Sequence, residues 1–497
     1  MQTGEEVAPA PTLARPAASP ALTVARREWR ELVRDSRLRL LAVVSLLLLL
    51  AALIAGFTQA QRLDRERSAA MLADRSLWDG QGAKNPHAAA HFGQYAFKPV
   101  GVLALADPGV DAHVGAAIWL EAHKQNEAQF RPARDSGLPG RAGNGLSLAF
   151  ILQALLSLLA ILLAFAGFSG ERERGTLRQV LALGVRPRDL LAGKAMAISG
   201  ALFILLLPAA IGVFAGIYTL DLEHHSGVSD HGQSVLRLGA LAVAYALYLA
   251  GFVALALAVS ARAKSSRAAL VILLAFWLAN TFLAPRLSSD WVRSFAPLPS
   301  AQQFRDAIAA DKRQLFGHDE SHPAFVAFKA RVLAEYGVSR IEDLPVSFRG
   351  LSLREDDHAG YRIFDRHHAA LQAAIDRQDA LRALPGALLP SLAVQPVSMA
   401  LAGTDSRHQY HFTTQAEGHR RLIQEIVSDD LIRNARNGGP DYQAPPALFA
   451  SIPSFAYQHP SIGEVLTGDA RNLAALALWA FGCTLFALRS VARLRAV

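Results

Sequence analysis

Six long uncharged apolar runs dominate the hydropathy pattern of this chain. A helix rises about 1.5 Å per residue, so about 20 apolar residues cross the roughly 30 Å hydrocarbon core of a bilayer. The fifth and sixth runs are the shortest, and by length alone they also fit buried core helices, but arginines at their ends can snorkel to the interface. We therefore predict six transmembrane helices, at residues 40–61, 146–169, 195–220, 237–260, 268–285 and 471–489.

Two large polar segments separate these runs, residues 62–141 after the first and residues 286–470 after the fifth. In the first segment, a charged stretch from Arg62 to Arg75 can prolong the preceding helix, Phe97–Leu105 has the pattern of a short strand, and Ala116–Ala128 that of a helix. In the second, amphipathic patterns predict helices near Ala301–Leu315, Pro323–Tyr336, Asp356–Leu384 and Gln409–Arg436. The predicted fold class is an α-helical integral membrane protein with six transmembrane helices and a mainly helical (α or α+β) extracytoplasmic domain, in which the two segments pack together.

The N-terminal end has two parts. Residues 1–25 are rich in alanine and proline and lack apolar periodicity, so we expect a disordered tail. Residues 26–39 place Trp29, Leu32 and Val33 on one helical face among alternating charges, which predicts a helix in the membrane interface; an ordinary solvated basic flank is the alternative. The following apolar run is longer than the core of a cleaved signal and lies far from the first Met, so we expect it to stay attached.

Positive charge gathers in the short segments between the runs. The N-terminal segment, the loops at 170–194 and 261–267, and the tail around 490–497 carry 19 basic and 8 acidic residues, which leaves −3 of the chain's net charge of +8 for the other segments. Cytoplasmic loops carry the excess of Lys and Arg, so these segments and both termini are expected in the cytoplasm, and the loop at 221–236 outside. The high pI is thus a topology signal, and we expect no nucleic-acid partner.

The loop at 170–194 carries the most informative sequence. It opens with Glu171-Arg-Glu-Arg-Gly-Thr-Leu and continues through a basic stretch to Gly193-Lys194. A short helix held by membrane spans at both ends can pass force to those spans. In it, Gly175 permits a tight turn and Thr176 can cap the next helix. An apolar face for docking would come from Leu177, Val180 and Leu181. The alternative is a basic loop that only sets the topology.

The sequence lacks the catalytic and nucleotide-binding motifs that would indicate an enzyme. A phosphate-binding loop, Gly-x4-Gly-Lys-Ser/Thr, is missing: before Gly193-Lys194, Arg188 stands in place of the leading Gly, and Ala195 follows in place of the hydroxyl residue. Neither a Gly-x-Ser-x-Gly elbow nor a His-Glu-x-x-His pair occurs. We expect no catalytic residue and no cofactor in this chain.

The arrangement of interfacial helix, two spans and the Glu171 loop resembles the permease subunits of type-2 ABC transporters. In that family, Glu-x-x-x-Gly-Thr-Leu opens a cytoplasmic coupling helix between spans two and three. Four further stretches resemble the subgroup with large periplasmic insertions after the first and fifth spans: Asn85–Pro99, Trp119–Asn126, Glu342–Pro345 and Ser398–Asp405. The candidate residues for coupling to the ATPase are Glu171, Glu173, Gly175, Thr176, Leu177 and Leu181.

The resemblance implies partners and a location. The partners are a dimeric cytoplasmic ABC ATPase subunit, which binds ATP and Mg²⁺, a second permease subunit that is the same or homologous, and the lipid bilayer. The expected location is the bacterial inner membrane, with several spans. We expect an exporter or extractor of an amphipathic or peptide-like molecule. The alternatives are a membrane-anchored receptor or assembly factor, which would work without ATP turnover, and a metalloenzyme on a membrane anchor.

Histidines and polar span residues leave further alternatives open. All sixteen histidines fall outside in this topology, and His408 and His411 are spaced for one helix face, so they are the candidates for a metal, with structural histidines as the default interpretation. The single cysteine, Cys483, excludes an intramolecular disulfide. Three polar residues at membrane depth either face a substrate path or cross-link helices: Gln153, Asn280 and Thr281.

Overall fold

The computed structural model describes residues 19–111, 113–129, 147–221, 231–317, 319–435 and 441–494. Within these ranges, six helical stretches are long and apolar enough to cross a membrane, which confirms the predicted number. The spans are α2 (Ser36–Asp79), α9 (Pro187–Asp221), α10 (His231–Arg262), α20 (Ala470–Val491) and two interrupted helices. One interrupted helix is α5 (Leu148–Phe150), η2 (Ile151–Leu155), α6 (Leu156–Ala164) and α7 (Ser169–Glu173); the other is α11 (Ser266–Leu278), η3 (Ala279–Leu283) and α12 (Ala284–Phe295).

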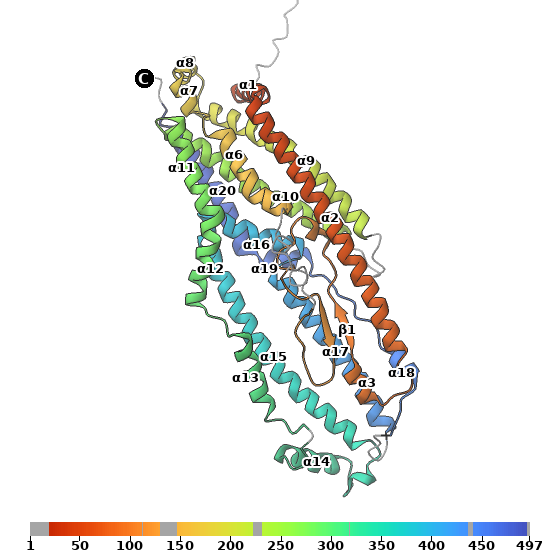
Figure 1. The fold of residues 1–497 in the computed structure, drawn as a ribbon. Helices are drawn as coiled ribbons and strands as arrows, with labels where there is room; N and C mark the ends of the chain where they lie inside the picture. The colour runs from red at the N-terminus through yellow and green to blue at the C-terminus, as the bar shows by residue number, and fades with distance from the viewer. Residues whose placement is uncertain are drawn as a thin grey trace, which may run out of the picture.

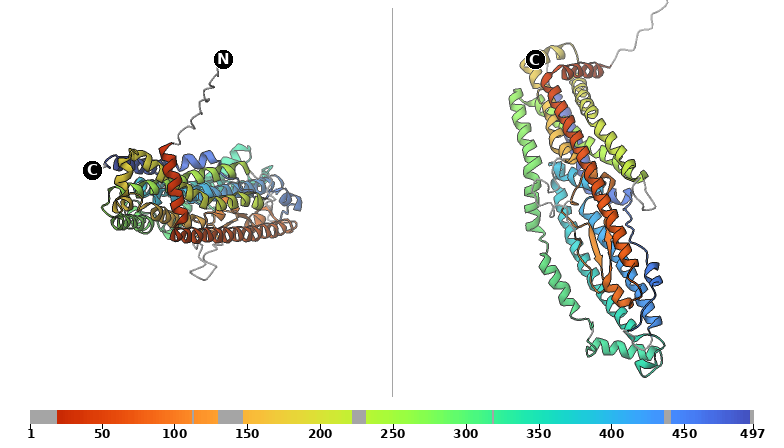
Figure 2. Two further views of the ribbon diagram at one scale, coloured as in Figure 1. Left: turned by 90° about the horizontal axis from the view of Figure 1, so that it is seen from above. Right: turned by 45° about the vertical axis from the view of Figure 1, so that its right-hand side comes forward.

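The molecule is elongated, with the spans at one end and a helical domain at the other (Figures 1 and 2). The end of the bundle farthest from the domain carries α1 (Pro20–Arg34), α7 and α8 (Thr176–Ala182). Helix α1 begins inside the predicted 1–25 tail, because Ser19 caps it and Pro20 starts it; residues 1–18 lie outside the described residues. We refer to this part as the α7–α8 end.

Helix α2 has 44 residues, about 66 Å, so it is longer than the roughly 30 Å hydrocarbon core of a bilayer and continues into the domain. Helix α2 extends through the charged stretch after Arg62, where i,i+4 ion pairs such as Arg62–Glu66 (2.7 Å) support it. Its last turn is anchored by Trp78, which is fully buried and donates to the Phe449 carbonyl at 2.9 Å. The outer domain is therefore built directly on the spans.

The first outer segment contradicts two local predictions. The strand is β1 (Gln94–Phe97), and Val102–Leu105 forms a 3₁₀ turn, η1, where strand was expected. The expected helix at Ala116–Ala128 is β2 (Ala117–Leu120), paired antiparallel to β1 with Phe97 opposite Ala117. Tertiary burial overrides local preference here, because the pairing buries Ile118 and Leu120.

The second outer segment has the four expected helices. They are α13 (Ala301–Lys312), α14 (Pro323–Glu335), α15 (Phe348–Ala383) and α17 (Ser406–Asn434), accompanied by the shorter α18 (Pro446–Ser451) and α19 (Ile462–Gly468). The first segment adds α3 (Pro86–Phe92). One hydrophobic core joins Ala89 and Ile118 of the first segment to Phe412 and Ile423 of the second, so the two segments pack together as expected.

An element absent from the predictions returns into the bundle. After α15, η5 (Leu384–Ala387) and α16 (Ser391–Ala402) pack against α10 and α20. The Ser391 amide donates to Asn280 Oδ1 at 3.0 Å, and Asn280 lies roughly 21 Å along its helix from the start at Ser266. Helix α16 therefore lies at the depth of the spans. The sequence feature that could have predicted this helix is the uncharged run between Arg382 and Asp405.

Candidate functional site

The coupling motif forms a sharp turn between α7 and α8. Gly175 has φ of 76°, in the left-handed region that favours glycine, and it occupies the N-cap position of α8. Thr176 does not cap α8 as expected; its hydroxyl donates back to the Glu171 carbonyl at 3.3 Å. The turn is thus set by the glycine and tied to α7 by the threonine.

A buried cation joins three elements below this turn. The Nζ atom of Lys194, in α9, lies 2.9 Å from Glu171 Oε1 and 2.5 Å from Glu28 Oε1 of α1. Lys194 is 2% exposed and Glu171 5%. Close packing supports the arrangement, since a side chain at Gly193 would collide with the Ala21 carbonyl and Val24 of α1. Glu171 is therefore an internal ion-pair partner in this structure, and its role in coupling to an ATPase stays a prediction.

The α7 helix also holds the other loop at this end. Glu173 accepts from the Ser266 amide and hydroxyl, both at 2.8 Å, and so caps the start of α11. Arg172 donates to the carbonyls of Ala261 and Ala263, each at 2.6 Å, at the end of α10. Helix α7, which ends the second span, is thereby connected to three other spans, α9, α10 and α11.

The apolar face of α8 points inward. Leu177 is 5% exposed and packs in the core of the bundle, and Leu181 is partly buried against the same core. In this conformation the bundle itself covers the apolar face of α8, so Leu177 is not exposed for docking, and the coupling role of Leu177 and Leu181 stays a prediction. The side chains that α8 and its C-terminal turn expose are Arg178, Gln179, Ala182 and Leu183, the last at 82%. Sequence reasoning missed Leu183, although it follows directly on the helix.

Two of the three polar residues predicted at membrane depth cross-link the spans to α16. The Gln153 side chain donates to the Tyr245 hydroxyl at 3.0 Å. This hydroxyl lies 2.9 Å from Ser398 Oγ of α16, and Ser398 in turn donates to the buried Asp107 at 2.5 Å. Asn280 holds Ser391, as described above. Thr281 Oγ1 is buried without a hydrogen-bond partner among the described residues. Gln153 and Asn280 thus both anchor α16.

The expected metal candidates do not converge. His408 is buried, with Nδ1 2.5 Å from Asp405 and Nε2 3.3 Å from Arg237, whereas His411 Nδ1 contacts the Tyr457 hydroxyl at 3.0 Å. Their ring nitrogens are therefore committed to different partners.

A different histidine group gathers in the outer domain: His87, His91 and His123 each offer one ring nitrogen, and these three nitrogens lie within 4.8 Å of one another. Burial first, and then the neighbouring imidazoles and Arg349, lower the pKa of His87 to about 3, so its ring is neutral near neutral pH. Sequence reasoning missed this group. The i,i+4 spacing of His87 and His91, which places them on one helix face, was the sequence feature that could have predicted part of the group.

Comparison with known families agrees with the arrangement of spans and loops. Residues 22–328 match the ABC-2 family transporter protein, and residues 301–458 match a domain of unknown function, DUF3526. A search of curated proteins gives no match. The first match covers more than half of the chain and includes five of the six spans together with α1, α7 and α8. The chain belongs to the ABC-2 family of transporter proteins.

Proposed function

We propose that this chain couples a dimeric cytoplasmic ABC ATPase to the export or extraction of an amphipathic molecule across the bacterial inner membrane. Membership of the ABC-2 family makes the chain a multi-pass membrane permease of an ABC transporter, and the family implies a cooperating ATPase. The α7–α8 end, with both termini, lies in the cytoplasm in this proposal, and the ATPase binds ATP and Mg²⁺. The DUF3526 region then forms the periplasmic domain of a subgroup with large insertions.

The observation that carries the proposal is the buried ion pair of Lys194. It connects the turn at Gly175 to α1 and to the start of α9, while Arg172 and Glu173 connect the same turn to α10 and α11. A displacement of α8 is therefore passed to several spans at once, because no flexible segment intervenes between the turn and these contacts. Such a rigid connection is what a coupling helix needs.

Continuity between the bundle and the domain supports the proposed direction of transport. Helices α2, α12 and α15 pass from one to the other, and α16 returns from the domain to the spans (Figure 1). A molecule released from the bundle on that side would meet the domain directly. This arrangement supports export or extraction.

The test is co-purification of the ATPase with the full chain. The tagged chain would be expressed in its own host, solubilised in detergent, and compared with Leu183→Asp, in which a charge replaces the exposed apolar side chain beside α8. We expect the wild type to bring down an ABC ATPase with ATPase activity, identified by mass spectrometry. Leu183→Asp should retain a tenth or less of it, since burying a carboxylate in an interface is costly.

Val326→Asp is the matched control. Val326 is an apolar residue of α14, 55% exposed, at the opposite end of the molecule, so this variant should bind the ATPase as the wild type does. Failure of the wild type to recover any ABC ATPase would favour the receptor or assembly factor. Full recovery with Leu183→Asp would move the docking surface away from α8.

A further inference from the structure

Three histidines from two elements meet where the two outer segments join. His87 and His91 lie one turn apart on α3, with Nε2 atoms 3.2 Å apart and ring centroids 4.7 Å apart. His123 comes from the loop after β2, and its ring lies 5.1 Å from that of His87 and 5.4 Å from that of His91. One face of α3 and one loop thus present three imidazoles to the same point.

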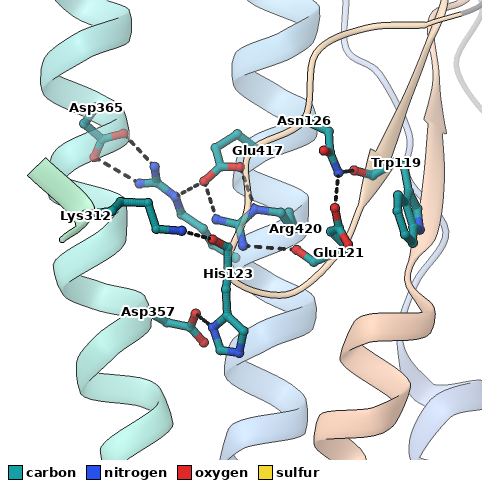
Figure 3. Close-up of polar contacts among 10 residues, drawn as sticks. Trp119, Glu121, His123, Asn126, Lys312, Asp357, Asp365, Glu417 and Arg420 are labelled. Atoms are coloured by element: carbon teal, nitrogen blue, oxygen red, sulfur yellow. Dashed lines mark hydrogen bonds and ion pairs between the residues drawn. The ribbon is translucent and has the colours of Figure 1, made fainter. Parts of the chain in front are cut away.

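His123 is held in an uncommon backbone conformation. Its φ is 59°, and among the described residues it is the only non-glycine with a positive φ. Two elements of the second outer segment fix it: Asp357 of α15 lies 2.7 Å from its Nδ1, and Lys312 of α13 donates to its carbonyl at 2.7 Å (Figure 3). A strained residue that is fixed at both its backbone and its ring suggests a function for that ring.

The distances suit a metal ion. Imidazole nitrogens lie about 2.0–2.1 Å from Zn²⁺, so two ligands of a tetrahedral site are roughly 3.3 Å apart. His87 and His91 already have this spacing, and a ring nitrogen of His123 lies within 4.8 Å of both. We propose that His87, His91 and His123 bind a divalent transition metal ion of the Zn²⁺ class, with water in the fourth position.

The surroundings agree with such a site. The Nδ1 hydrogen of His123 directed at Asp357 places the ring lone pair on Nε2, the arrangement of a carboxylate that orients a metal-bound histidine. His91 is exposed, which gives the ion a path from solvent and room for the water. Imidazoles without thiolates favour Zn²⁺, Cu²⁺, Ni²⁺ or Co²⁺ over Mg²⁺ or Ca²⁺.

The site would connect the two outer segments, because its ligands come from the first and its orienting carboxylate from the second. Asp357 is 6% exposed and lines a small cavity together with His87, Gln424 and Ser428. The bound ion would thereby hold α3 and the β2 loop against α15.

The test is metal binding by the full chain, purified in detergent through a tag without histidines and stripped with a chelator. Calorimetry with Zn²⁺ should show one saturable equivalent, and Co²⁺ should give the intense visible absorption of a tetrahedral site. The thermal midpoint should rise with Zn²⁺. His91→Ala should abolish all three signals, and Asp357→Asn should weaken Zn²⁺ binding by about 10- to 100-fold.

His113→Ala is the matched control, because His113 is an exposed histidine of the same outer segment and lies outside the group. It should bind Zn²⁺ as the wild type does. His91 is itself exposed, so His91→Ala should fold, and its midpoint without metal should equal that of the wild type. No saturable Zn²⁺ binding by the wild type, or unchanged binding by His91→Ala, would overturn the proposal and leave a hydrogen-bonded histidine cluster.

Discussion

Lys194 shows how a single buried charge can organise one end of a membrane protein. Its ammonium group is shielded from solvent, and two carboxylates from α1 and α7 neutralise it. A buried charge costs several kcal/mol to desolvate, and good geometry with its partners offsets that cost. Removal of either the ammonium group or a carboxylate should therefore lower the free energy of unfolding, whereas removal of one partner of an exposed ion pair should change it little.

Lys194→Met tests this at the residue scale. The change keeps the length of the side chain but leaves Glu171 and Glu28 without their cation, so we expect a loss of about 3–5 kcal/mol in unfolding free energy. Thermal unfolding in detergent would measure it. Arg186→Met is the control, because Arg186 pairs with Asp189 while its side chain is 76% exposed, and it should cost less than about 1 kcal/mol. Equal effects of the two changes would contradict the proposed role of Lys194.

At the scale of elements, the sequence predicted the helices that depend only on their own local composition. The six spans and the four outer helices follow from apolar runs and helical periodicity, which need no partner. The β1–β2 pair depends on a contact across more than twenty residues, and α16 depends on the spans that surround it. Three prolines, Pro385, Pro390 and Pro396, interrupt the uncharged run that contains α16, and prolines in such a run favour a loop over a helix. Likewise, the position of Glu171 was predictable, but its partners Lys194 and Glu28 were not.

The position of η5 and α16 leads to an accessibility prediction. Leu388 lies between them and is 76% exposed, and at the depth of the spans an exposed leucine faces lipid. In a Cys483→Ala background, Leu388→Cys should resist a membrane-impermeant maleimide in intact membranes and react after detergent denaturation. Val326→Cys, on α14 of the outer domain, should react at once when the side of the membrane that carries this domain is exposed to the reagent. Rapid labelling of Leu388→Cys would place α16 outside the bilayer.

At the scale of the whole molecule, an apolar face of α12 is left exposed by the residues that the structure describes. The helix from Ser266 to Phe295 is about 45 Å long, so it exceeds the roughly 30 Å hydrocarbon core. Along its outer half, Leu287, Trp291 and Phe295 recur every fourth residue with exposures of 62%, 40% and 69%. Part of this face projects beyond lipid, where exposed apolar side chains usually mark a binding surface. A second permease subunit, which the family resemblance implies, is a candidate to cover it.

Disulfide cross-linking decides whether that subunit is a second copy of this chain. Cys483 is the only cysteine, so Cys483→Ala gives a clean background for Leu287→Cys, Trp291→Cys and Phe295→Cys. If two copies meet along α12, at least one variant should form a covalent dimer in oxidised membranes, because bonded Cα atoms lie about 4.4–6.8 Å apart. Leu72→Cys is the control: it is 74% exposed on α2, which runs along the opposite edge in Figure 1, and it should stay monomeric. Monomers with all three α12 variants would exclude a homodimer through this face, whereas a dimer with Leu72→Cys as well would show random collision.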